Sequence, residues 1–227
     1  MQEKPKKRGE VKIALPKTLS FDPKLHKYTI NGGPADGVTT IIGGLMKVKY
    51  GDLSFFVNRY NGMVFESEVI EKAGDYGTAL HSCCAEIAAG RDINLSKLPS
   101  KLSLPLEGYK PFLRDQGIQP LLLEQIVADE DSMVCGTIDM VARWCDRVWI
   151  FDIKTGSIDP KIVDLQLAGY EWLLRTCSGY RGRIGRAVIT PPGKDGKGRW
   201  KIKATGSGQK SIRLFKNLIE IHKELKS

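Results

Sequence analysis

Two β-rich runs joined by a very short connection constrain the fold of this chain more than any other feature. Residues 133–144 and 148–155 are rich in strand-forming side chains, and only Cys145-Asp146-Arg147 separates them. Runs of this kind with so short a connection predict an antiparallel β-hairpin. If Asp146-Arg147 is a two-residue turn, Asp139 pairs with Lys154. A bulge or a three-residue turn would change this register.

The expected register places two carboxylates and a lysine on one face of the hairpin. Asp152 would pair with Val141, and directly opposed residues and residues two apart on a strand point to the same face. Asp139, Asp152 and Lys154 then lie together. Paired oxygen ligands suit Mg²⁺ or Mn²⁺, and a nearby lysine can position or activate a water. A surface salt-bridge cluster is the alternative, but Asp152 follows the apolar run Val148–Phe151, which is typical of a sheet interior.

A helix with clear start signals follows the hairpin. Asp159 suits the N-cap position and Pro160 suits the first helical position. Gln166 and Tyr170 are four residues apart, so this helix would present both on one face. A Gln-x-x-x-Tyr pattern is weak by itself and gains meaning from its place one helix after Asp152-x-Lys154.

Taken together, these residues resemble the PD-(D/E)xK nuclease superfamily and, within it, the RecB-type exonuclease branch. Gly136-Thr137-Ile138-Asp139, Asp152-x-Lys154 and Gln166-x-x-x-Tyr170 match three motifs of that branch in order. Gly77-Thr78-Ala79-Leu80-His81 matches its upstream Gly-Thr-x-x-His stretch. The resemblance covers about residues 26–175. Within the branch, the chain resembles small phage-encoded members that have no iron–sulfur cluster.

The resemblance implies an α/β, restriction-endonuclease-like fold with a central mixed β-sheet flanked by helices. It also implies the roles of the site residues, although a lone histidine on a helix is by itself more often structural than a ligand. The implied metal ligands are His81, Asp139, Asp152 and the backbone carbonyl of Ile153. The implied catalytic residues are Lys154, Asp139, Asp152, Gln166 and Tyr170.

Glu124 interrupts the apolar run 121–128, which reads as a strand buried on both faces. A carboxylate in such a run is costly unless it is paired or bound to a metal. Glu124 is therefore either an accessory residue of the site or a strand-edge glutamate that meets a lysine, and the sequence leaves both open.

The charge balance favours an anionic partner. The 227 residues carry a formal net charge of +9 and a pI near 9.3, which suits nucleic acid more than a membrane surface. No apolar run approaches the roughly 20 residues of a membrane span, and MQEKPKKRGE has no apolar segment of a secretory signal. We expect no membrane association and a cytoplasmic location, in the host cytoplasm if the chain is phage-encoded.

The cysteines indicate packing rather than chemistry. The five cysteines include no Cys-x-x-Cys pair, and their spacing disfavours a zinc or iron–sulfur site and a disulfide framework. Cys135 and Cys145 of the hairpin are expected to pack, so that the site uses a hard divalent ion alone.

The length favours one nuclease domain, residues 19–227, after a flexible basic tail at 1–18. Residues 19–50 should form an N-terminal hairpin whose second strand is Val38–Ile42, and 52–61 a short helix. The catalytic core spans 77–178, and 179–227 form a basic hairpin and a final helix. In this last part we expect contacts with DNA phosphates, with Trp200 either stacking on bases or packing on the core. The expected DNA-binding residues are Arg181, Arg183, Lys194, Lys197, Arg199, Trp200 and Lys201.

These patterns predict a Mg²⁺-dependent (or Mn²⁺-dependent) DNA exonuclease in recombination, repair or phage DNA processing. A structure-specific endonuclease would use the same residues, and a non-catalytic DNA-binding module would use the same fold. A recombination or replication partner protein is possible, but no residue identifies it.

Overall fold

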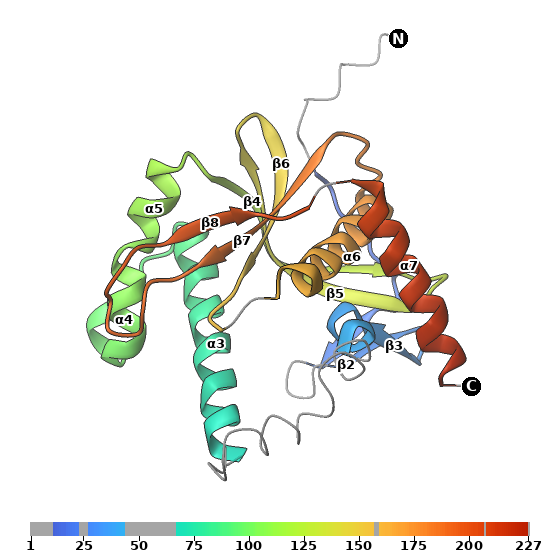
Figure 1. The fold of residues 1–227 in the computed structure, drawn as a ribbon, viewed down its shortest axis with the longest axis horizontal. Helices are drawn as coiled ribbons and strands as arrows, with labels where there is room; N and C mark the ends of the chain where they lie inside the picture. The colour runs from blue at the N-terminus through green and yellow to red at the C-terminus, as the bar shows by residue number, and fades with distance from the viewer. Residues whose placement is uncertain (1–10, 23–26, 44–66, 157–158, 207, 227) are drawn as a thin grey trace.

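The protein is an α/β structure built on a mixed β-sheet (Figure 1). The computed structural model describes residues 11–22, 27–43, 67–156, 159–206 and 208–226, with the backbone alone for 67–75. Within these ranges the sheet has eight strands and is flanked by helices on both faces. This confirms the predicted α/β class with a central mixed sheet. The helix expected at 52–61 lies outside the described residues.

The sheet order is β1-β2-β3-β5-β6-β7-β8, with β4 paired to β5. The strands are β1 (Ser20–Asp22), β2 (Lys27–Ile30), β3 (Gly33–Gly37), β4 (Gln119–Asp129), β5 (Val134–Trp144), β6 (Arg147–Ile153), β7 (Ile184–Thr190) and β8 (Lys201–Ala204). The helices are α3 (Ser67–Ala88), η1 (Leu95–Lys97), α4 (Ser100–Glu107), α5 (Tyr109–Asp115), α6 (Pro160–Ser178) and α7 (Gln209–Glu224). No described helix combines the length and apolar character that a bilayer span needs.

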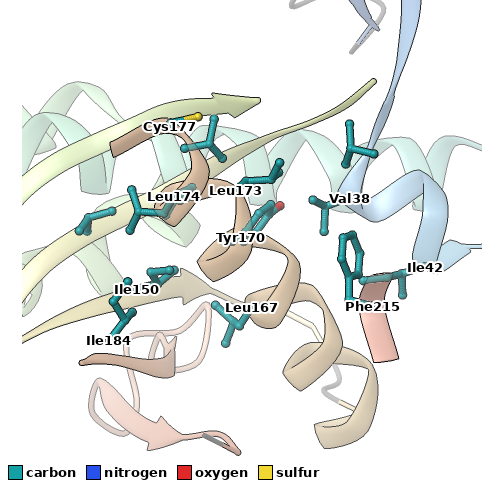
Figure 2. Close-up of a cluster of buried hydrophobic side chains, with 14 of the residues drawn as sticks. Val38, Ile42, Ile150, Leu167, Tyr170, Leu173, Leu174, Cys177, Ile184 and Phe215 are labelled. Carbon is teal, nitrogen blue, oxygen red and sulfur yellow. The ribbon is translucent and has the colours of Figure 1, made fainter. Parts of the chain in front are cut away.

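Two hydrophobic clusters cover opposite faces of the sheet. On one face, Leu167 and Leu173 of α6 pack with Ile150 of β6, and Phe215 of α7 joins the same cluster (Figure 2). Gly169 of α6 makes room for α7, because a Cβ there would lie 2.8 Å from the Phe215 ring. The other face is covered by α3, α4 and α5. The sheet is thus buried on both sides, as its apolar central strands predict.

The hairpin of β5 and β6 forms, but its turn differs from the predicted one. Trp144 pairs with Arg147, so Cys145 and Asp146 make the two-residue turn, with φ of 47° and 57°. A type I′ turn needs positive φ at both central residues, and Arg147 is already the first residue of β6. The pairings expected for Asp139 and Asp152 are therefore wrong by two residues.

The N-terminal hairpin also forms, but with a different second strand. Asn31 and Gly32 turn the chain with φ of 53° and 76°, and Gly33–Gly37 pairs with β2. Residues 38–43, where we expected a strand, are helical. Val38 and Ile42 are buried in the core (Figure 2), and their spacing of four is helical rather than alternating.

Residues 11–18, which we assigned to a flexible tail, make defined contacts. Val11 is buried in the core cluster, and the backbone N–H of Ala14 donates to the carbonyl of Cys177 over 2.9 Å. The start of the described chain is therefore part of the folded domain.

The neighbours Phe215 and Leu214 on α7 offer a direct test of the core. Phe215 is fully buried against α6, whereas Leu214 is 45% exposed. We expect Phe215→Ala to lower the free energy of unfolding by about 3–5 kcal/mol because it leaves a cavity. Leu214→Ala should change it by less than about 0.5 kcal/mol. Urea unfolding followed by circular dichroism measures both; equal losses would contradict the described seating of α7.

Candidate metal centre

The candidate site lies where one edge of β5 changes partner. The pairing of β5 with β3 ends at Cys135, and its pairing with β6 begins at Met140. Asp139 stands at this opening. Its Oδ2 accepts a hydrogen bond of 2.7 Å from the N–H of Ile153 and lies 3.4 Å from Nδ1 of His81 on α3. Asp139 at this opening therefore contacts both helix α3 and the backbone of β6.

Glu124 of β4 completes a cluster with His81 and Asp139. The residues before and after Glu124, Leu123 and Gln125, pair with Met140 and Ile138, so Glu124 stands opposite Asp139. Ligand atoms of the three side chains all lie within 4.8 Å of one another. Like charges directly opposed on adjacent strands are destabilising. The arrangement is one that a cation would stabilise.

The backbone at Glu124 is strained. Its φ is 45°, within a strand that is otherwise extended. A non-glycine residue in the left-handed region costs on the order of 1–3 kcal/mol and persists only where its surroundings impose it. This positive φ occurs at the residue whose carboxylate joins the cluster.

Asp152 lies beside this cluster in a hydrogen-bonded chain. Its Oδ2 is 2.9 Å and its Oδ1 3.1 Å from Nζ of Lys154, and Nε2 of Gln166 donates to Oδ1 over 3.0 Å. The same Gln166 nitrogen lies 3.2 Å from the hydroxyl of Tyr170. Asp159 caps α6, because its Oδ1 accepts hydrogen bonds from the backbone N–H groups of Lys161 and Ile162. This cap fixes the start of the helix that carries Gln166 and Tyr170.

The cluster shifts the pKa values of its own members. Loss of hydration, followed by repulsion from Asp139, raises the pKa of Glu124 to about 7. Burial and the same repulsion raise the pKa of Asp152 to about 6, with Lys154 opposing the shift. Burial acts to lower the pKa of His81, but its hydrogen bond and attraction to Asp139 raise it overall. The carboxylates thus repel one another, and a cation would relieve this.

An open cleft of about 580 Å³ gives access to the cluster. His81, Glu124 and Asp139 form one part of its lining, and Tyr170 and Gly136 another. A Cβ at Gly136 would lie 2.7 Å from the Tyr170 ring. Only glycine therefore allows this close approach of β5 and α6, which gives a physical reason for the first residue of the Gly-x-x-Asp pattern.

The structure brings the predicted catalytic residues together, and it adds Glu124 to two of the predicted ligands; the predicted ligand set stays a prediction. His81 and Asp139 cluster with Glu124, whose role the sequence left open, while Asp152 contacts Lys154 and Gln166. Ile153 enters the site through its N–H. The signal for Glu124 in the sequence was a lone charge inside an apolar strand.

Trp200 does not offer a face for base stacking. It is buried at 6% exposure, its Nε1 donates to the carbonyl of Pro105, and its ring packs on Tyr109 with centroids 4.6 Å apart. The prediction that Trp200 binds DNA is therefore wrong, and the alternative of a tryptophan packed on the core is correct.

The basic residues expected to bind DNA separate into two groups. Asp152 on β6 is level with Val188 on the parallel strand β7. Arg181 and Arg183 precede β7, whereas Lys194, Lys197, Arg199 and Lys201 follow it. At about 3.3 Å per residue, Arg183 lies some 16 Å along the strand direction from the level of Asp152. Only the second group shares the end of the sheet that carries Asp152 and Lys154.

Comparisons with known proteins do not assign the chain to a family. No protein-family model matches the chain, and no curated protein matches it. Among solved structures, the chain is similar to the one described as "Crystal structure of SSO0001", with a TM-score of 0.36 and 15% identity over 82% of this chain and 74% of that one. A likeness this weak carries no argument about function.

Glu124→Gln should raise the thermal stability of the metal-free protein at high pH. The folded protein raises the pKa of Glu124 to about 7, above its ordinary 4.5, so its charge disfavours folding fully above pH 7. This cost falls as the pH drops from 7 and vanishes below about 4.5. We expect Glu124→Gln to raise the Tm in EDTA at pH 8 and to leave it unchanged at pH 4.

The exposed Glu107 of α4 provides the control. Glu107→Gln should leave the Tm nearly unchanged at both pH values. If Glu124→Gln lowered the Tm at pH 8, Glu124 would be stabilising the metal-free fold, and the repulsive cluster would be refuted.

Proposed function

We propose that the protein is a divalent-metal-dependent deoxyribonuclease, a small RecB-type member of the PD-(D/E)xK superfamily. The observation that carries the proposal is the cluster of His81, Glu124 and Asp139 beside the Asp152–Lys154 pair. These groups come from α3, from the neighbouring strands β4, β5 and β6, and, for Lys154, from the residue that follows β6. A fold that collects opposed carboxylates and a strained backbone around one open cleft has features that cluster at functional sites.

The donor set fits Mg²⁺ or Mn²⁺. Carboxylate oxygens suit both ions, and a single imidazole is also a good ligand for first-row metals. His81, Glu124 and Asp139 would hold the ion, with Asp152 as a further oxygen donor beside them. When bound, such an ion lowers the pKa of a bound water and stabilises charge on a phosphate.

The residues around this centre have separate tasks in hydrolysis of a phosphodiester bond. Nζ of Lys154 lies 2.9 Å from Oδ2 of Asp152 and the side chain is 28% exposed, so its ammonium would position the attacking water and stabilise negative charge. Gln166 holds the carboxylate of Asp152 by donating to Oδ1, which limits its rotation. Tyr170 closes the floor of the cleft against Gly136. Asp152 and Lys154 thereby keep a fixed mutual geometry before substrate binds.

The substrate we propose is DNA, and the activity we propose is exonucleolytic, in recombination, repair or phage DNA processing. The basic loop 191–199 lies at the same end of the sheet as Lys154, and it would contact backbone phosphates near the scissile bond. Lys194 illustrates its position, since its Nζ lies 4.4 Å from the centroid of the Tyr76 ring at the start of the described side chains of α3.

Lys154→Ala should reduce Mg²⁺-dependent degradation of end-labelled linear DNA by at least about 100-fold, because it removes the group that positions the attacking water. Lys161→Ala, on the exposed first turn of α6, removes the same charge outside the cleft and should keep nearly full activity. Full activity of the Lys154→Ala protein would refute the site assignment. Binding of labelled DNA without cleavage by the unaltered protein would favour a non-catalytic module.

A comparison of substrates separates exonuclease from endonuclease. Linear and covalently closed circular DNA are incubated with the unaltered protein and Mg²⁺, with EDTA as the blank. An exonuclease should degrade the linear DNA alone, and 5′- and 3′-labelled strands then report its polarity. Cleavage of the circle would identify an endonuclease.

Asp139→Asn should abolish stabilisation by Mn²⁺. A ligand at 100 times its Kd stabilises the folded state by about 2.7 kcal/mol, so Mn²⁺ should raise the Tm of the unaltered protein. Asp92→Asn, on an exposed loop beside Lys110, is the control and should respond like the unaltered protein. An equal Mn²⁺ shift for Asp139→Asn would place the metal elsewhere.

A further inference from the structure

A second polar groove, of about 880 Å³, lies between the C-terminal half of α6 and the first turns of α7. It shares no lining residue with the cleft of the metal centre. Five of its lining residues are cationic: Arg175, Arg181, Lys210, Arg213 and Lys216. No lining residue that the structure describes is acidic, so the groove is a concentration of positive charge.

Most of these cations have no carboxylate partner among the residues that the structure describes. Arg175 is the exception, because it binds Glu171 and also donates to the carbonyls of Tyr180 and Gly182. Arg175 therefore holds the turn after α6 in place. For Arg181, Lys210, Arg213 and Lys216, no ion pair with a carboxylate occurs within the described ranges.

The helix that carries most of these cations is packed firmly on α6. Ile212 and Phe215 of α7 are buried against α6, so the helix that carries Lys210, Arg213 and Lys216 cannot shift freely. Nζ of Lys216 lies 5.2 Å from the centroid of the Trp172 ring, within range of a cation–π interaction. Like charges held together on fixed elements repel, and an anionic ligand would remove this repulsion.

The positive charge of the whole chain is concentrated in its C-terminal third, which carries both the groove and the basic loop 191–199. Residues 160–227 contain 15 lysines and arginines against 5 aspartates and glutamates, whereas the complete chain has a net charge of only +9. The remainder of the chain is thus close to neutral. An anion approaching the protein would be steered to this C-terminal third.

We propose that the groove binds backbone phosphates of the DNA substrate at a distance from the scissile bond. This inference rests on the proposed nuclease function. Arg181 lies three residues before the start of β7, so the groove lies toward the end of the sheet opposite Asp152. The seven residues from Arg181 to Val188, which is level with Asp152, span at most about 23 Å at about 3.3 Å per residue. At about 3.4 Å per nucleotide, a strand reaching both places spans on the order of seven nucleotides. The groove holds the long substrate while the metal centre acts on its end.

The test measures binding of fluorescein-labelled single-stranded DNA in EDTA, with a 30-nucleotide and a 4-nucleotide probe. Lys210→Gln/Arg213→Gln changes two exposed residues of the groove. It should weaken binding of the 30-nucleotide probe at least threefold and reduce the salt dependence of log K by about 0.7 per lost phosphate contact. Binding of the 4-nucleotide probe should not change. Lys97→Gln/Lys101→Gln, at exposed positions of η1 and α4, is the charge-matched control and should keep the original affinity.

The proposal is overturned if the groove variant binds the 30-nucleotide probe like the control, or if both variants lose equal affinity. It is also overturned if the groove substitutions weaken binding to phosphatidylserine vesicles and leave DNA binding intact. A protein that binds DNA through the groove but never cleaves it with Mg²⁺ would refute the proposed function alone. A protein that cleaves DNA with unchanged binding in the groove variant would refute the groove alone.

Discussion

Strand β5 divides one of its edges between two partners, and the candidate site depends on this division. Its first residues pair with β3 and its last residues with β6, while β4 follows the other edge along nearly the whole strand. Between the two partners, Asp139 is free to turn its carboxylate toward the N–H of Ile153 and toward His81. A continuous ladder on that edge would close the opening and separate α3 from the strand carboxylates.

The electrostatics of the opening follow from this geometry. Glu124 faces Asp139 across the β4–β5 ladder, and Asp152 stands close enough that Asp139 raises its pKa. Lys154 and Gln166 offset part of the cost of burying Asp152, which is only 4% exposed. Glu124 is offset only in part by its attraction to His81, because loss of hydration and repulsion from Asp139 still raise its pKa to about 7. It also carries the positive φ of 45°, so it is a carboxylate that a nearby metal ion would stabilise.

Much of the fold was accessible from sequence because local signals agreed with one another. The apolar run before Asp152, the cap at Asp159 and the short hairpin connection each predicted one element, and each element forms. The turn position was missed because composition alone does not show which residues adopt positive φ; Cys145 does so here against its usual preference.

Other errors came from tertiary packing. Val38 to Ile42 is β-branched and reads as a strand, yet the core takes Val38 and Ile42 from one helical face. Trp200 lies in a basic loop region, but its ring packs on Tyr109 and its Nε1 donates to the carbonyl of Pro105. Glu124 could be flagged as anomalous but not placed, because its position opposite Asp139 depends on the long-range register of β4.

Helix α6 connects the two charged regions of the molecule. One side presents Gln166 and Tyr170 to the candidate metal centre, and its C-terminal half forms a wall of the basic groove. The fully buried Arg186 of β7 lies 3.5 Å from Glu171 and 3.6 Å from Asp164, both on α6. A buried charge is strongly destabilising once a partner is removed. Displacing α6 would separate Arg186 from Asp164 and Glu171, so these ion pairs fix the position of α6 relative to β7. A ligand in the groove would therefore contact a helix that already holds Gln166 and Tyr170 in place at the candidate metal centre.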